Sequence, residues 1–136
     1  MIEAVNPPDW EKPKGYANGM LVDGARLYTG GQIGWNKDQV FEHQDFVGQL
    51  EQTLANIAAI VQAAGGEVTD IVRLTWFITD KKAYMANQKE IGAAYRKVMG
   101  RHFPSMSVVV VAALIEDAAL VEIEATAEIG KSRKDG

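Results

Sequence analysis

The chain contains no cysteine, so disulfide bonds, thiolate nucleophiles and cysteine metal sites are excluded. Its two histidines, His43 and His102, are far apart and share no metal-ligand spacing. The sequence also lacks a phosphate-binding loop, a nucleophile elbow and a dinucleotide fingerprint. These absences predict a protein that works without a metal ion or a cofactor.

An excess of positive charge and long apolar runs are missing as well. The formal net charge is −4, which argues against nucleic acid as a partner. No apolar run approaches the roughly 20 residues that a membrane span needs. The N-terminus has no basic region followed by an apolar stretch, which is the pattern of a signal peptide. We therefore expect a soluble, cytoplasmic protein with no membrane partner.

A chain of 136 residues with 47% apolar and 24% charged residues is typical of one globular domain. We place that domain at residues 19–129. Residues 1–18, which hold three of the four prolines, are expected to be an irregular segment of the same domain. Residues 130–136 contain a cluster of basic side chains and are interpreted as a solvated tail.

The first part of the domain has the pattern of a β-hairpin. Residues 20–22 and 25–33 are the two strands, and Asp23-Gly24 predicts a type I′ turn. Three glycines lie late in the second strand or just past it. They indicate a bulge, a close approach of another group to the backbone, or only a strand end. These glycines are Gly30, Gly31 and Gly34.

Two helices follow from the spacing of apolar residues. The stripe from Phe46 to Val61 predicts a helix that Asp45 caps and Gly65-Gly66 ends. A second helix is predicted over residues 80–99. Further strands are expected at 68–79, 106–114 and 120–125, the last two as neighbours, and residues 35–43 are expected to be a loop or a short edge strand. The order β-β-α-β-α-β-β predicts an α+β fold with both helices on one face of the sheet.

The second face of that sheet also needs a cover. Residues 108–111 are four consecutive valines, so both faces of their strand are predicted to be apolar. The helices cover only one face. The simplest cover for the other is a second copy of the same sheet, which predicts a homo-oligomer.

Four local motifs carry a resemblance to a known family. They lie at residues 15–19 (GYANG), 28–34 (YTGGQIG), 54–66 (LANI followed by AAGG) and 121–127 (VEIEATA). In this order and spacing they resemble the Rid (YjgF-type) enamine/imine deaminases. The resemblance implies a chorismate-mutase-like fold with a mixed sheet, assembled as a homotrimer around a central barrel. It also implies three intersubunit clefts in which imines are hydrolysed to a ketone or keto acid and ammonia.

The sequence departs from that family at three places around the expected cleft. Pro104-Ser105-Met106-Ser107 stands where the family most often has an arginine that clamps the substrate carboxylate, and a thioether cannot replace a guanidinium. Gly92 stands where many members have asparagine, and the turn at 115–119 is one residue longer than usual. Arg101 offers a displaced positive charge, but it is also an ordinary cation at a helix C-terminus.

Glu122 is the leading candidate for catalysis. A glutamate in a partly buried strand can have a raised pKa and exchange protons near neutral pH. The family implies that it positions a water molecule, whereas from the strand pattern alone an outward or interface position is favoured. Glu124 shares its face of the strand. Tyr16 is a second catalytic candidate, because its hydroxyl or its ring could close the cleft.

Three further residues are expected to bind the substrate: Gly31 through its backbone, Met106 at the position of the missing clamp, and Trp35 as a wall of the pocket. A plain packing role is equally open for Trp35. Trp76 alternates with Leu74 and Ile78 and is expected in the core or an interface.

The leading hypothesis is thus a cofactor-free deaminase of a small imine or enamine. A homotrimer that binds a small molecule without turning it over is the alternative. A ribonuclease, an activity sometimes attributed to this family, is least favoured because of the negative charge.

Overall fold

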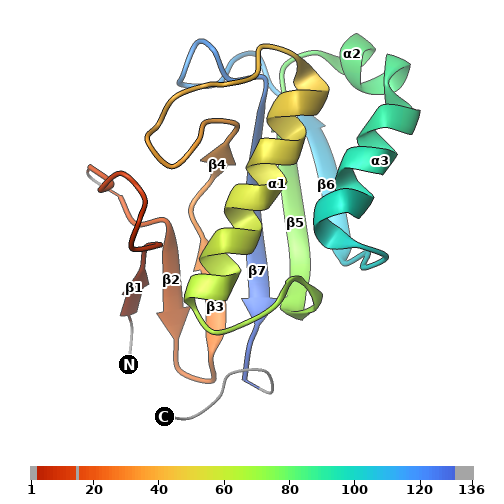
Figure 1. Ribbon diagram of the computed structural model, residues 1–136. Helices are drawn as coiled ribbons and strands as arrows, with labels where there is room; N and C mark the ends of the chain where they lie inside the picture. Colours follow the sequence, from red (N-terminus) through yellow and green to blue (C-terminus); the bar gives the residue numbers. More distant parts are fainter. Residues whose placement is uncertain (1–2, 15, 131–136) are drawn as a thin grey trace.

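The computed structural model describes residues 3–14 and 16–130, so Gly15 and the basic tail at 131–136 lie outside the described part (Figure 1). The strands are β1 (Glu3–Val5), β2 (Gly19–Val22), β3 (Arg26–Thr29), β4 (Gln32–Ile33), β5 (Ile71–Ile78), β6 (Ser105–Val110) and β7 (Val121–Glu128). The helices are α1 (Phe46–Ala63), α2 (Lys81–Ala86) and α3 (Gln88–Met99), and a 3₁₀ turn covers Val68–Asp70.

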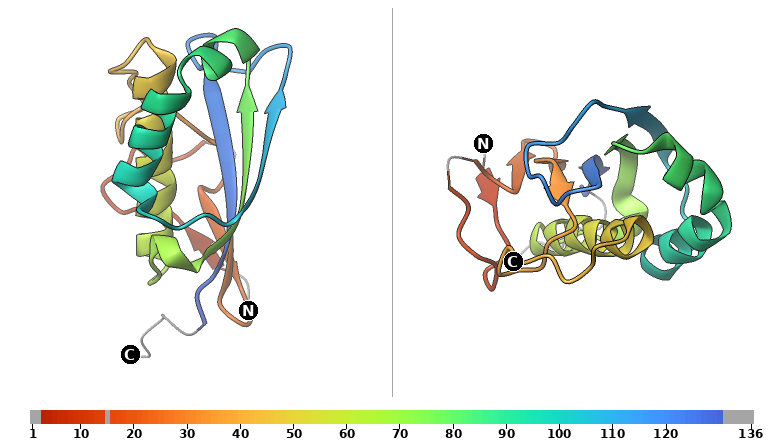
Figure 2. Two further views of the ribbon diagram at one scale, coloured as in Figure 1. Left: turned by 90° about the vertical axis from the view of Figure 1, so that its right-hand side faces the viewer. Right: turned by 90° about the horizontal axis from the view of Figure 1, so that it is seen from above.

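All seven strands form one mixed sheet in the order β1-β2-β3-β7-β5-β6, with β4 paired to β7. The β5–β6 pair is parallel and the other pairs are antiparallel. Helices α1 and α3 form a layer on one side of the sheet, and no helix of the described residues lies over the opposite side (Figure 2). The predicted α+β architecture with the helices on one face is therefore confirmed.

Helix α1 begins and ends where the sequence predicts. The Asp45 carboxylate accepts a hydrogen bond from the Gly48 amide at 3.0 Å, and Gly65 has a φ of 89° just after the helix. Its apolar stripe packs on the sheet, and Trp76 of β5 is 2% exposed in the same core. Burial of this stripe supplies the main hydrophobic stabilisation of the layer.

The second predicted helix is wrong in one respect, because it breaks at Asn87 into α2 and α3. The Asn87 and Gln88 side chains donate to the carbonyls of Ala83 and Tyr84, at 2.7 and 2.6 Å. In a continuous helix those carbonyls would accept hydrogen bonds from the backbone amides of Asn87 and Gln88. The side chains compete with the helical ladder, and the helix changes direction at Asn87.

The hairpin also differs in detail from the prediction. Its positive φ values fall at Gly24 (87°) and Ala25 (59°), rather than at Asp23 and Gly24 as in a type I′ turn. The second strand is interrupted between β3 and β4. At this point a side chain on Gly30 would meet the Ala17 carbonyl at 2.8 Å, because the N-terminal segment crosses here.

Two other strand predictions are corrected. β1 lies in the segment that was expected to be irregular, whereas residues 34–45 form a loop, as one of the two alternatives for residues 35–43 predicts. The strands β6 and β7 are not neighbours, because β5 lies between them. The connection from β6 to β7 therefore crosses over β5, although β6 and β7 are consecutive strands in the sequence.

The second sheet face is less apolar than the valine run suggests. Met106, Val108 and Val110 pair with Leu74, Trp76 and Ile78, which face the helices. Ser105, Ser107 and Val109 of β6 therefore face the other side, and of these three only Val109 is apolar. We call this side, without helices, the open face.

Candidate functional site

A hollow of about 270 Å³ lies where β4 meets β7, and we call it the Glu122 hollow. It brings together four of the five predicted site residues: Tyr16, Gly31, Trp35 and Glu122. The remaining lining residues are Asn18, Gln32, Ile33 and Ile115. None of these eight residues is cationic, so within one chain the hollow offers a carboxylate, a phenol and amide groups.

The contact between Glu122 and Gly31 is the closest feature of the site. A β-carbon on Gly31 would lie 2.8 Å from the Glu122 carboxyl carbon and 3.0 Å from its γ-carbon. The carboxylate therefore occupies the space that any side chain at residue 31 would need. This is a close approach of another group to the backbone, one of the readings that the glycine pattern allowed.

Glu122 is half-buried on β7, where it pairs with Ile33 on one side and Phe77 on the other. Burial raises the pKa of its carboxyl group above the ordinary value, and the charge of Glu124 raises it further. No hydrogen bond or ion pair with another described residue stabilises its charged form. Such a carboxyl group can exchange a proton with a ligand or a water molecule.

The two aromatic residues border the hollow from different loops. The Tyr16 hydroxyl accepts a hydrogen bond from the Gln39 side chain at 3.2 Å, and Tyr16 is 49% exposed. Trp35 packs against Phe41 with a ring-centroid distance of 5.9 Å. Ile115 is 97% exposed at the rim, which is unusual for a large apolar side chain and leaves a surface for another molecule.

Buried polar residues of α1 hold this hollow in shape, and the sequence reasoning missed them. Asn56 donates hydrogen bonds to the carbonyls of Ile33 and Trp35, at 3.0 and 2.8 Å. Gln49 donates to the Ala118 carbonyl and accepts from the Leu120 amide, both at 2.8 Å. The signal was a polar row inside the apolar stripe, with Gln49 and Asn56 seven residues apart.

Met106, the fifth predicted site residue, lies elsewhere. It faces the helix side of the sheet through its pairing with Leu74, whereas Glu122 lies on the other face. Met106 lines a second hollow, between α3 and β6, which we call the α3–β6 hollow. The expected site, with both residues, cannot form within one chain. Arg101 lines neither of these hollows.

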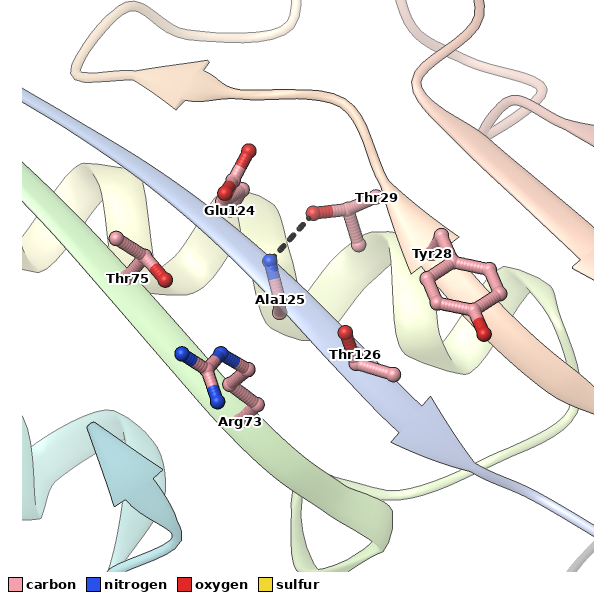
Figure 3. A pocket seen from close by; sticks show the side chains of 7 residues that line it. All are labelled: Tyr28, Thr29, Arg73, Thr75, Glu124, Ala125 and Thr126. Atoms are coloured by element: carbon pink, nitrogen blue, oxygen red, sulfur yellow. Dashed lines mark hydrogen bonds between the residues drawn. The ribbon is translucent and has the colours of Figure 1, made fainter. Parts of the chain in front are cut away.

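A third hollow, of about 290 Å³, lies on the open face (Figure 3). Figure 3 shows its side chains on three adjacent strands, with α1 behind the sheet. Arg73 and Glu124 both line it, and neither side chain forms a hydrogen bond or ion pair with a described residue. Thr29 fixes the strand junction, because its hydroxyl oxygen accepts from the Ala125 amide at 2.9 Å.

Within residues 3–14 and 16–130, no group of three His, Asp or Glu side chains is placed to hold a metal ion. No helix in that part of the chain is long and apolar enough to cross a membrane.

The profile of the family described as Endoribonuclease L-PSP matches residues 11–129 of this chain. The protein is a member of the endoribonuclease L-PSP family. This is the Rid (YjgF-type) family that the four motifs resemble, so that prediction is confirmed. The fold agrees too: YyfA of Yersinia pestis, a Rid family protein of unknown function, superimposes with a TM-score of 0.81. That match has 31% identity over 94% of this chain and 99% of YyfA.

Two further relatives of this L-PSP family member have informative names. The 2-iminobutanoate/2-iminopropanoate deaminase of Escherichia coli is 37% identical over 107 residues, which are 76% of this chain and 80% of the deaminase. E. coli TdcF, solved with bound serine, has 31% identity and a TM-score of 0.78. The match covers 93% of this chain and 98% of TdcF. The relationship supports a Rid-type deaminase as the class of enzyme.

Proposed function

We propose that the protein hydrolyses small reactive imines or enamines, without a cofactor, in a cleft that contains Glu122. The observation that carries the proposal is the half-buried Glu122 carboxyl group, with its raised pKa, packed on Gly31 beside Tyr16. The relationship to a named imine deaminase gives the reaction class.

In this mechanism a water molecule adds to the carbon of the C=N bond. The Glu122 carboxylate accepts a proton from the water, and the protonated carboxyl group then donates a proton to the nitrogen. In the second step the carboxylate accepts the hydroxyl proton of the carbinolamine and passes it to the amino nitrogen as the C–N bond breaks, so that ammonia leaves and the carboxylate is regenerated. The products are a carbonyl compound and ammonia, so atoms and charge balance. The Tyr16 hydroxyl borders the same space and can hold the water or the nitrogen.

We further propose that the working form is a homotrimer whose clefts combine two copies of the chain. Glu122 and Met106 lie on opposite sheet faces, so a cleft with both must take one from each copy. The exposed apolar side chains of Ile115 and Met106 and the unpaired Arg73 and Glu124 on the open face fit an interface. Native mass spectrometry tests this assembly directly.

The experiment for the activity measures ammonia release above the spontaneous rate. Imines are generated in situ from amino acids with an amino-acid oxidase and from amines with an amine oxidase. The imines of the first kind carry a carboxylate group, and those of the second kind do not. We expect acceleration by the wild type and its loss in Glu122→Gln. The matched control is Glu124→Gln on the same strand and face, which should remain active. If the wild type accelerates ammonia release from none of these imines, the proposed reaction is refuted.

A ligand-binding trimer without turnover is the second candidate, because no described residue that lines the Glu122 hollow is a cation that could hold a substrate carboxylate. Thermal shifts with keto acids, aromatic acids and amines, in the absence of ammonia release, would favour it. A ribonuclease agrees with the family's name but not with the net charge of −4, and a test for RNA binding at low salt decides it.

A further inference from the structure

The loop between β4 and α1 contains a tight turn at residues 36–40, in which Gln39 has an unusual backbone conformation (Figure 1). The Gln39 amide donates to the Asn36 carbonyl, and the Asn36 amide donates to the Val40 carbonyl, both at 2.9 Å. Gln39 has a φ of 62°, in the left-handed region. Turns of this kind favour glycine at this position, because a side chain there costs energy. The turn itself therefore does not require a glutamine at residue 39.

Asn36 holds this turn in shape on both sides of Gln39. Its side-chain oxygen accepts hydrogen bonds from the amides of Asp38 and Val40, at 2.9 and 3.1 Å. Its side-chain nitrogen donates to the Glu42 carboxylate at 2.6 Å. Because the Asn36 side chain ties the turn at three points, the backbone that carries the Gln39 side chain is held in one conformation.

The Gln39 side chain reaches from this turn to Tyr16, which lines the Glu122 hollow. Its nitrogen donates a hydrogen bond to the Tyr16 hydroxyl oxygen at 3.2 Å. Among the described residues, no other group forms a hydrogen bond with that hydroxyl. A phenol oxygen that accepts one hydrogen bond directs its own hydrogen elsewhere. The hydrogen of the Tyr16 hydroxyl is therefore available to a group in the Glu122 hollow.

We propose that Gln39 is a positioning residue, which makes the Tyr16 hydroxyl a hydrogen-bond donor to the imine nitrogen. This role rests on the proposed deaminase reaction and defines what Tyr16 does in it. The Glu122 carboxylate takes a proton from the water, and the nitrogen gains electron density as the water oxygen bonds to the carbon. Tyr16 donates a hydrogen bond to that nitrogen without transferring its proton. Gln39 does not line the hollow, so it acts only through Tyr16.

The hydrogen bond from Tyr16 strengthens as the nitrogen gains electron density. It therefore stabilises the transition state more than the bound imine. Loss of the Gln39 side chain should for this reason lower kcat and change KM little.

The test follows ammonia release from an imine that an amine oxidase generates, so that no carboxylate is present. Gln39→Gly keeps the left-handed backbone and removes the side chain, and it should lower kcat about fivefold. Gln39→Glu reverses the bond, because a carboxylate accepts the Tyr16 hydrogen, and it should lower kcat at least as much. Gln39→Lys, whose ammonium group donates, should retain most of the activity. Gln44→Glu is the matched control, because Gln44 is exposed in the same loop, and it should keep the kcat of the wild type.

Two further measurements distinguish positioning from a role in the fold of the loop. In a Tyr16→Phe background, Gln39→Gly should lower kcat no further, because the hydroxyl through which Gln39 acts is absent. In urea unfolding, Gln39→Gly should not lose stability, because glycine adopts a positive φ without strain. A further fall of kcat in the Tyr16→Phe background would overturn the proposal, and so would a Gln39→Glu variant as active as the wild type.

Pyruvate, the keto acid formed from the alanine-derived imine, tests the positioning role apart from the reaction. Its carbonyl oxygen accepts a hydrogen bond from Tyr16 as the imine nitrogen does, so calorimetric titration should show about fivefold weaker binding in Gln39→Gly. In the Tyr16→Phe background the same change should have no effect. If this pattern holds while the wild type releases no ammonia, the positioning role stands and the proposed reaction is rejected. If the wild type and the Gln39 variants release ammonia at equal rates, the reaction stands and the positioning role is rejected. A wild type that neither releases ammonia nor binds pyruvate overturns both.

Discussion

Replacing Asn56 with alanine will both lower the stability of the protein and loosen the Glu122 hollow. Asn56 is 5% exposed, and its amide nitrogen donates to the carbonyls of Ile33 and Trp35. The variant leaves both carbonyls without this donor. An unsatisfied buried group costs about 1–3 kcal/mol, and the half-buried Trp35 carbonyl will recover part of the loss from water. We therefore expect a loss of about 2–3 kcal/mol in the free energy of unfolding.

Urea unfolding at one fixed protein concentration measures this loss, since the stability of an oligomer depends on concentration. The unfolding midpoint should fall by about 1 M. Gln62→Ala is the matched control, because it makes the same amide-to-alanine change on the exposed side of α1 and should alter stability by less than about 0.5 kcal/mol. Imine hydrolysis should fall in the Asn56 variant even where the protein is fully folded. If the two variants unfold alike, the Asn56 hydrogen bonds do not hold the hollow as described.

Three further predictions follow from the site and the open face. Gly31→Ala should reduce kcat/KM for imine hydrolysis at least tenfold without unfolding the chain, because its β-carbon displaces the Glu122 carboxylate; unchanged kinetics would contradict the packing in the hollow. The raised pKa of Glu122 means that the native state binds more protons than the unfolded chain between the two pKa values, so stability falls as pH rises through that window. As pH rises to 7 from below the pKa of Glu122 in the unfolded chain, the free energy of unfolding of Glu122→Gln should therefore increase relative to that of the wild type. Urea unfolding measures both proteins, and a difference that does not change with pH would refute the prediction. Arg73→Glu should dissociate the oligomer in native mass spectrometry, because it replaces the cation of the hollow on the open face with a second carboxylate near Glu124, and an unchanged mass would remove Arg73 from the interface.

The positions of Met106 and Arg96 bear on which substrates the protein takes. Met106 stands where the family most often has an arginine, and the Arg96 side chain lines the same hollow without a hydrogen bond or ion pair to any described residue. In the proposed two-copy cleft, the α3–β6 hollow of one chain meets the Glu122 hollow of another, and an imino acid with a bulky apolar side chain fits the combined space. Comparing phenylalanine-derived and alanine-derived imines, in the wild type and Arg96→Gln, measures this preference. Equal rates for the two imines in both proteins would show that the α3–β6 hollow does not contribute to the cleft that contains Glu122.

Local features of the sequence were enough to predict the elements that depend on local signals. The apolar stripe and caps of α1 were read correctly, because they lie within one turn of the residues that they affect. The alternation in β7 placed Glu122 and Glu124 on one face for the same reason. The break at Asn87 was missed, because apolar spacing continues across it and only side-chain hydrogen bonds reveal the change.

The pairing of strands that are far apart in the chain could not be predicted from the sequence. The insertion of β5 between β6 and β7 depends on how the crossovers pack, which no local pattern specifies. Because of that insertion, the valine run became an edge strand with a largely polar second face.

The sequence by itself determined the α+β class, the family and a carboxylate at residue 122 that faces away from the core. Only the tertiary structure decided what surrounds that carboxylate. It placed Gly31 beneath Glu122, tied the neighbouring loop to Asn56, and put Met106 on the opposite face of the sheet. These relations depend on strand order and register, which arise from burial across the whole sheet rather than from any segment of the chain.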